Sequence, residues 1–223
     1  MLTPRKRIRK KDLKEDKLVT FYFKSRAWID DHLKEITIGL LAVVLIIAGI
    51  GIYTYLHGKA EKTASVEFSK AVRTFQAMDY RNAAKEFGVL TSKYGGTRSG
   101  KLARFYLAQS HYQNGEYEQA AKQFRKAAGA LSGDKQLKAA ALAGEAAALE
   151  QLGKYAEAAK KFQAVAEKYK DIPKAPYYLL RAARCWQLAG NSQKASALYQ
   201  RIITDFPDSR EKEDAVLLSS LKW

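Results

Sequence analysis

Hydrophobic and polar residues follow each other in two different patterns along this chain. Between Ile36 and Leu56 the sequence ITIGLLAVVLIIAGIGIYTYL holds 21 residues without a charge. A helix of that length measures about 31 Å, close to the roughly 30 Å thickness of the hydrocarbon core of a bilayer. After Lys59 the apolar residues instead recur at the spacing of amphipathic helices. The two patterns predict one membrane-spanning helix followed by an all-α domain.

The amphipathic part of the chain divides into four helix pairs and one final helix. Turn residues separate these helices: Gly115, Gly153 and Gly190 stand inside pairs, whereas Pro173 and Pro207 follow pairs. The predicted helices cover residues 60–77 with 80–94, 98–114 with 117–131, 135–152 with 155–170, 175–189 with 192–205, and finally 209–222.

An alanine followed four residues later by an aromatic ring marks the second helix of each pair. The small alanine lets the first helix approach closely, and the ring fills the space beside it. The marks follow each other at steps of 37, 38 and 37 residues, and a period in this range predicts an α-solenoid of stacked helix pairs. They stand at Ala83/Phe87, Ala120/Phe124, Ala158/Phe162 and Ala195/Tyr199.

These marks resemble the tetratricopeptide repeat over about residues 62–210. The second copy reads LAQSHYQNGEYEQAAKQFRKA, the third AAALEQLGKYAEAAKKFQAVA, and the fourth AARCWQLAGNSQKASALYQRII. The first copy, FSKAVRTFQAMDYRNAAKEFGVL, lacks the small-residue pair in its first helix, as a terminal unit can. The resemblance implies four tetratricopeptide-like helix pairs, a C-terminal capping helix and a surface that binds other proteins.

The region before the span is basic and partly aromatic. Because its lysines and arginines outnumber Lys59 and Lys62 behind the span, we expect the N-terminus in the cytoplasm and the repeats across the membrane. A lead of 35 residues and the long apolar run favour an uncleaved anchor over a signal peptide. The predicted organisation is 1–35 lead, 36–56 transmembrane helix and 57–223 repeat domain. The basic residues ahead of the span are Arg5, Lys6, Arg7, Arg9, Lys10, Lys11, Lys14 and Lys17.

The segment 18–33, LVTFYFKSRAWIDDHL, mixes aromatic with basic residues just ahead of the span. This composition suits a short amphipathic helix lying on the cytoplasmic leaflet, so membrane lipid is one expected partner. A protein partner for the segment stays open.

The whole layout resembles the bacterial YfgM-type family, ancillary subunits of the SecYEG translocon. The resemblance rests on the basic lead, the single span, the translocated repeats and the segment KLVTFYFKSRAWIDDHLKEI. It implies an inner-membrane protein with a periplasmic repeat domain. The partners that it implies are the SecYEG translocon and periplasmic chaperones or exported clients.

The net charge of +16 is distributed along the chain, and no nucleic-acid docking motif accompanies it. We therefore expect no nucleic-acid partner and interpret the charge as favouring solubility and acidic surfaces. The three histidines, His32, His57 and His111, lack metal-ligand spacing, and Cys185 is the single cysteine. Cys185 is expected to be a small buried residue. The sequence predicts neither a cofactor nor a metal nor catalysis.

The family resemblance places the first helix of each pair along an inner groove. It implies that Phe68 and Phe75 of the first pair and Ala143 and Ala147 of the third also face this groove. The carboxylate-clamp subclass needs Lys and Asn where Phe105 and Gln109 stand, so acidic C-terminal peptides are not the expected partner. The predicted binding residues are Phe105, Gln109, Tyr112, Glu150, Tyr177, Leu180, Arg184 and Gln187.

Two other functions stay open. A scaffold for envelope assembly or cell division is one, because the run Phe206-Pro207-Asp208-Ser209 resembles repeat proteins of those systems. Many of those carry a cleaved signal or a lipid-attached cysteine, which Cys185 cannot provide. An enzyme or cofactor-maturation subunit is the other, and it predicts a metal or haem in the purified protein.

Overall fold

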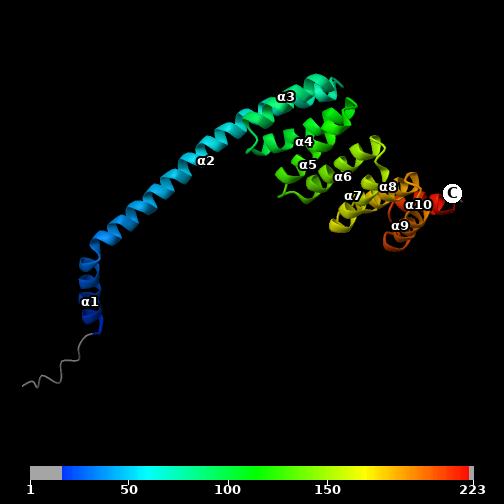
Figure 1. Cartoon of the computed structure of the whole chain (residues 1–223). Helices are drawn as coiled ribbons and strands as arrows, with labels where there is room; N and C mark the ends of the chain where they lie inside the picture. The colour runs from blue at the N-terminus through cyan, green and yellow to red at the C-terminus, as the bar shows by residue number, and fades with distance from the viewer. Residues whose placement is uncertain (1–16, 221–223) are drawn as a thin grey trace, which may run out of the picture. The chain divides into compact units, whose positions relative to one another are not determined.

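The structure, a computed structural model, describes residues 17–220 of the chain (Figure 1). Within this range it holds ten helices and no strand, which confirms the all-α prediction. The chain divides into two compact units, Met1–Leu56 and His57–Trp223. The basic residues Arg5 to Lys14 lie outside the described range. The helices are α1 (Lys17–Asp31), α2 (Leu33–Gln76), α3 (Tyr80–Lys93), α4 (Arg98–Gln113), α5 (Tyr117–Ala130), α6 (Lys135–Gln151), α7 (Tyr155–Lys168), α8 (Ala175–Leu188), α9 (Ser192–Asp205) and α10 (Glu211–Ser220).

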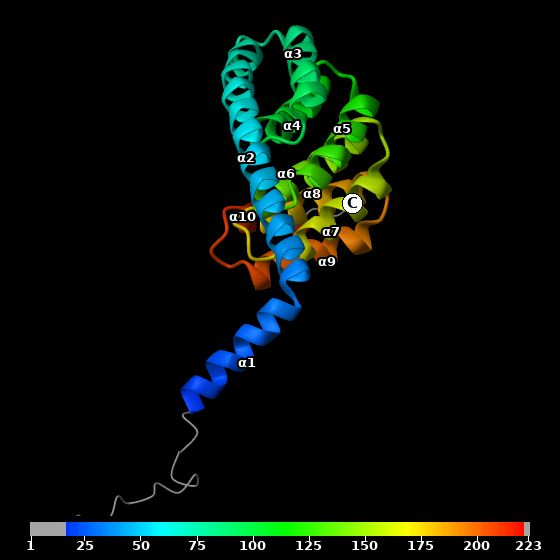
Figure 2. The same cartoon turned by 90° about the vertical axis from the view of Figure 1, so that its left-hand side faces the viewer.

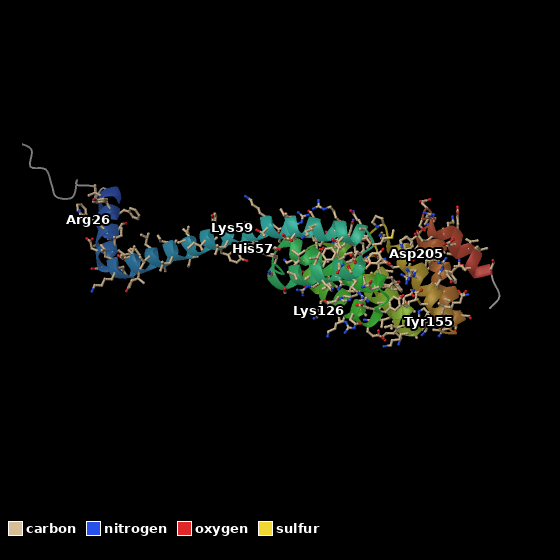
Figure 3. All side chains as sticks on the ribbon, turned by 90° about the horizontal axis from the view of Figure 1, so that it is seen from above. Arg26, His57, Lys59, Lys126, Tyr155 and Asp205 are labelled. Carbon is tan, nitrogen blue, oxygen red and sulfur yellow. The ribbon has the colours of Figure 1, made fainter. Side chains whose placement is uncertain are left out.

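The first unit consists of α1 and the apolar beginning of α2. Among the described residues, α2 is the one helix that is long and apolar enough to cross a membrane, and its most apolar stretch has no buried residue. Side chains such as Leu41 and Ile47 are 62% and 64% exposed, and sticks project from this stretch in Figure 3. A stretch of this kind is compatible with a single-pass membrane anchor.

The predicted span and the first repeat helix belong to one helix rather than two. The sequence predicts separate helices over 36–56 and 60–77, whereas α2 runs from Leu33 to Gln76. Gly58 is the poorest helix former between them, and a glycine costs only about 1 kcal/mol relative to alanine. No proline stands nearby to remove a backbone donor, so the helix continues through this region.

The second unit stacks its helices as the predicted pairs (Figure 2). Apart from the start of α2, the helix ends lie within two residues of the sequence prediction, although residues 221–222 of the last predicted helix lie outside the described range. Gly115, Gly153 and Gly190 link the two helices of a pair with φ values of 76°, 73° and 77°. Glycine adopts this left-handed conformation without a Cβ penalty, which explains why the turns carry it.

The alanine and aromatic marks form the core of the solenoid. All four alanines and all four rings are at most 2% exposed. They belong to three neighbouring clusters, and burying one large apolar side chain of this kind is worth about 1.5–3 kcal/mol. The capping helix α10 packs against α9 and α8 through the buried Ala215.

The buried carboxylate of Glu145 links three successive helices, α5, α6 and α7. Glu145 of α6 is 2% exposed and accepts hydrogen bonds from Arg125 Nε and Nη2 of α5, at 2.9 and 2.6 Å. Lys161 Nζ of α7 lies 3.0 Å from the same Glu145 oxygen. Because Arg125 and Lys161 both pair with this charge, their attraction offsets the desolvation penalty of burying it.

Candidate protein-binding groove

A cavity of about 340 Å³, here called the groove, lies among the first helices of three successive pairs, α4, α6 and α8. Phe105, Gln109 and Tyr112 line it from α4, and Tyr177 lines it from α8. All four belong to the predicted set, so the structure brings these predicted residues together. Their binding role stays a prediction.

The floor of the groove is formed by small residues of α6. Ala140, Gly144 and Ala147 line it and recur at helical spacing on one face of that helix. A Cβ atom at Gly144 would lie 2.5 Å from the ring of Phe124, which is 1% exposed in the core. Gly144 therefore lets the aromatic mark of the second repeat pack directly beneath the groove.

Arg181 of α8 and Lys174, just before α8, are the charged residues that line the groove, and the sequence prediction missed both. The Nη1 atom of Arg181 donates a hydrogen bond of 2.7 Å to the Tyr177 hydroxyl, and its Nη2 donates one of 2.5 Å to Glu150 Oε2. The guanidinium also lies 5.0 Å from the ring centre of Phe162. Burial acts to lower the pKa of Arg181, but the hydrogen bond and charge of Glu150 outweigh it and raise the pKa above its ordinary value.

Glu150 lies beside the groove as the partner of Arg181 rather than as a free acid. Its side chain is 18% exposed and that of Arg181 is 21% exposed, so most of the pair is withdrawn from solvent. The pKa of Tyr112 is raised above its ordinary value, chiefly by burial. The nearby charge of Arg181 acts to lower this pKa, and the charge of Glu150 acts to raise it. The pair thus leaves this part of the groove without an uncompensated charge.

Leu180, Arg184 and Gln187 lie outside the groove. Leu180 is only 3% exposed and packs in the core, and Gln187 Oε1 accepts a 2.9 Å hydrogen bond from the buried Tyr199 hydroxyl. Leu180 and Arg184 line a second cavity, of about 400 Å³, and Arg184 pairs with Asp214 of α10 at 3.2 Å. Tyr177 lines both cavities, so the second cavity continues the groove toward the capping helix.

Helical geometry explains the difference within α8. At about 100° per residue, Arg181 is rotated about 40° from Tyr177, whereas Leu180 is rotated about 60° to the other side. The spacing of four residues from Tyr177 to Arg181 was the signal that could have identified Arg181. The sequence prediction instead followed 177, 180, 184 and 187, which turns away from the groove toward the second cavity at Leu180 and Arg184.

Phe68 and Phe75, the groove residues implied for the first pair, pack between repeats. The ring of Phe68 lies 5.8 Å from Phe87 and 5.4 Å from Tyr106, and that of Phe75 lies 5.6 Å from Tyr106. The first pair therefore contributes aromatic packing in place of groove lining at these positions.

Cys185 lies one turn beyond Arg181 and is fully buried, as the sequence predicts. Burial, together with the charge of Glu150 and its hydrogen bond, raises the pKa of the Cys185 thiol to about 12. A thiol with so high a pKa is a poor nucleophile near neutral pH. The groove instead offers aromatic faces, one amide, hydroxyl groups and the ammonium of Lys174, which suit contacts with side chains and backbone of a bound polypeptide.

The fold defines the chain as a tetratricopeptide-like solenoid, a class of protein–protein interaction scaffold. A family model described as tetratricopeptide repeat-like domain matches residues 26–172, and one described as tetratricopeptide repeat matches residues 177–209. The first match covers more than half of the chain, so the chain belongs to the tetratricopeptide repeat-like domain family. That match begins within α1 and includes the apolar part of α2.

Two solved structures show the same fold. One is the crystal structure of the Podosopora anserina putative kinesin light chain with nearly identical TPR-like repeats, at a TM-score of 0.55 and 16% identity over 71% of this chain and 82% of that chain. The other is a glutamine-to-methionine variant of the same protein, at a TM-score of 0.56 with the same identity and coverage. No curated protein matches the chain.

Proposed function

We propose that this protein is a membrane-anchored scaffold whose groove captures a segment of another protein. The observation that carries the proposal is the cavity between α4, α6 and α8, where aromatic walls stand over a floor of small α6 residues. A floor without long side chains leaves room for a partner segment, and exposed aromatic rings contribute strongly to protein interfaces. Tyr177 is 38% exposed, more than any other aromatic side chain that lines the groove.

We place the repeat domain in the bacterial periplasm, with α2 crossing the inner membrane and the N-terminus in the cytoplasm. The exposed apolar stretch of α2 and the basic residues ahead of it support this orientation. Periplasmic and cytoplasmic activity reporters fused after residue 223 test the topology. Activity of the periplasmic reporter is expected, and activity confined to the cytoplasmic reporter would overturn the assignment.

We assign α1 to the cytoplasmic membrane surface. Phe21, Tyr22 and Trp28 are 71%, 58% and 58% exposed, next to basic residues such as Arg26. Brominated lipids should quench the fluorescence of Trp28 in a single-tryptophan variant of the full chain. Quenching no stronger than that of a variant retaining only Trp186, which is 6% exposed, would contradict lipid contact.

The partners that we propose are the SecYEG translocon and the periplasmic chaperones or exported clients near it. The layout shared with the YfgM-type family supports this choice. A groove facing the exit of a translocon would hold chaperones or exported chains close to the site where clients emerge. The anchor would keep the groove at high local concentration there.

Photo-crosslinking in living cells tests the groove and identifies its occupant. A photoreactive amino acid replaces Tyr112 or Tyr177 in the full chain, and mass spectrometry identifies the crosslinked proteins. Tyr155, at the start of α7 and labelled in Figure 3, is the matched control because it does not line the groove. Shared partners from positions 112 and 177 are expected. Equal yields from position 155 would refute the groove, and partners unrelated to export would refute the translocon assignment.

A further inference from the structure

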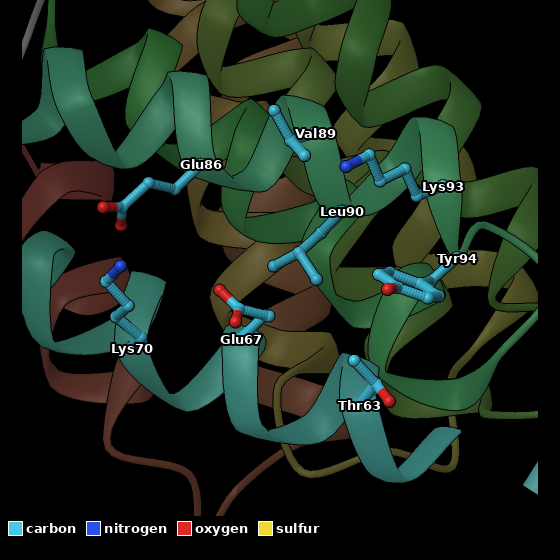
Figure 4. Close-up of a pocket in the computed structure, with 8 residues that line it drawn as sticks. All are labelled: Thr63, Glu67, Lys70, Glu86, Val89, Leu90, Lys93 and Tyr94. Atoms are coloured by element: carbon cyan, nitrogen blue, oxygen red, sulfur yellow. The ribbon is translucent and has the colours of Figure 1, made fainter. Parts of the chain in front are cut away.

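The first helix pair has an open outer face. The second helix of each pair packs against the first helix of the following pair, as α3 does with α4 and α5 with α6. Within the described residues of the repeat unit, no earlier pair stands before α2 and α3. A cavity of about 350 Å³ lies between these two helices, and no residue of α4 lines it (Figure 4).

Each helix contributes one acid and one base to this cavity. Glu67 and Lys70 come from α2, and Glu86 and Lys93 come from α3. None of the four takes part in an ion pair within the described chain, although Figure 4 shows the carboxylate of Glu86 and the amine of Lys70 on the same side of the cavity. The Oε2 atom of Glu86 is shielded from solvent and has no hydrogen-bond partner. Such an acceptor can take a hydrogen bond from water, from the Lys70 amine on the same side of the cavity or from a partner that covers the face.

The apolar part of the same face is also incompletely covered. Val89 lines the cavity and is 51% exposed, beside Leu90, which is 3% exposed. A partner that covers this face would bury Val89 and meet two acids and two bases. Because an acid and a base stand on both helices, a copy turned about a suitable two-fold axis can present its bases to the acids of this face and its acids to the bases.

We propose that a second copy of this chain covers the face in a two-fold symmetric dimer. A two-fold axis parallel to α2 and beside the open face places α2 of one copy against α3 of the other. Residues at the same height along this axis then face each other. Lys70 then meets Glu86 of the second copy, because each stands six residues from the end of its helix at the turn between α2 and α3. Symmetry produces this contact twice. The same axis keeps the repeat-domain part of α2, residues 57–76, parallel in the two copies.

Cysteine crosslinking of the full chain in native membranes tests the dimer. A Val89→Cys variant treated with a short bis-maleimide should give a product of twice the 25.0 kDa chain mass. Native Cys185 is fully buried and should not react. Leu217→Cys on α10 is the control because its side chain is 63% exposed but lies at the other end of the solenoid. Equal dimer yields from both variants, or products containing a different protein from Val89→Cys, would overturn the proposal.

A charge swap tests the pairing itself. Lys70→Glu on the Val89→Cys background should lower the dimer yield by about tenfold because like charges then face each other. Adding Glu86→Lys should restore the yield, because the swap recreates the pair across the two-fold axis. Lys126→Glu, on α5 and labelled in Figure 3, makes the same charge change elsewhere and should leave the yield unchanged.

Failure of the second substitution to restore the yield, at an unchanged melting temperature, would refute the contact. Photo-crosslinking from Tyr177 reports on the groove separately. Loss of the dimer with groove crosslinks retained would reject this inference alone, and the reverse result would reject the proposed function alone.

Discussion

Two carboxylates of α6, Glu145 and Glu150, both pair with basic side chains of other helices, yet they belong to different parts of the molecule. Glu145 has a side chain 3% exposed and binds Arg125 of α5 and Lys161 of α7. Glu150 is 18% exposed and binds Arg181 of α8 beside the groove. Five residues along a helix correspond to a rotation of about 140°. Position around the helix, rather than residue type, therefore decides whether an ion pair holds the stack or shapes the groove.

The largest expected effect comes from leaving Glu145 unpaired. The double variant Arg125→Met/Lys161→Met should lower the free energy of unfolding by about 3 kcal/mol, because a buried carboxylate then lacks compensation. Denaturant unfolding of the full chain in detergent, followed by circular dichroism, measures this loss.

Adding Glu145→Gln to that double variant should recover most of the stability, because a neutral amide is cheaper to bury than a carboxylate. If the triple variant is as unstable as the double one, the loss comes from the alkyl packing of Arg125 and Lys161 rather than from the charge. The contrast with Glu150 would then be unfounded.

The next effect concerns Gly144, which lies between the core and the groove and next to Glu145. Gly144→Ala places a Cβ atom 2.5 Å from the Phe124 ring and should destabilise the fold by about 1–3 kcal/mol through overpacking. The same unfolding measurement checks it. Gly129→Ala in α5 meets nothing within 4 Å, so it should be neutral or slightly stabilising. A neutral Gly144→Ala would indicate that Phe124 can move without loss.

Breaking the pair at the groove should have a smaller effect on stability and a larger one on binding. Arg181→Met should lower the free energy of unfolding by about 1.5 kcal/mol, since charged hydrogen bonds to Glu150 and Tyr177 are lost. Crosslinking from position 112 should also decrease. Arg184→Met is the control, because its exposed pair with Asp214 is worth at most about 1 kcal/mol. Equal effects of both variants would remove the special role of Arg181.

The smallest expected effect is a loss of folding stability at alkaline pH, caused by the Cys185 thiol. The pKa of Cys185 is raised to about 12 from 9.0, so the unfolded thiol ionises first as the pH rises above 9. Stability present below pH 9 should therefore decrease toward pH 12, by about 1 kcal/mol at pH 10 from this group. Melting curves between pH 7 and 10 measure the loss, and Cys185→Ala should reduce it. An identical pH dependence in both proteins would contradict the assignment.

The repeat architecture could be predicted because it is written at fixed spacing. The alanine and aromatic marks recur every 37 or 38 residues, and all of them are buried. The glycines of the turns adopt positive φ where the pattern places helix ends. The continuity of α2 could not be read in this way, because Gly58 resembles a helix breaker although its cost is small compared with that of a proline.

The groove was predictable in part. Phe105, Gln109, Tyr112 and Tyr177 line one cavity, as the family resemblance implied. Arg181 was missed, because an arginine in a helix of mixed composition gives no sign of whether its charge is paired until the facing helix is known.

The sequence by itself determined the helices, their pairing and the anchor-like apolar run, because these depend on local periodicity, turn residues and length. Only the tertiary structure decided which side chains share a space: Glu150 with Arg181, Glu145 between α5 and α7, and the open face of α2 and α3. The physical reason is that the rotation of one helix against the next comes from packing across repeats. A shift of one residue around a helix moves a side chain by about 100° and exchanges groove for core.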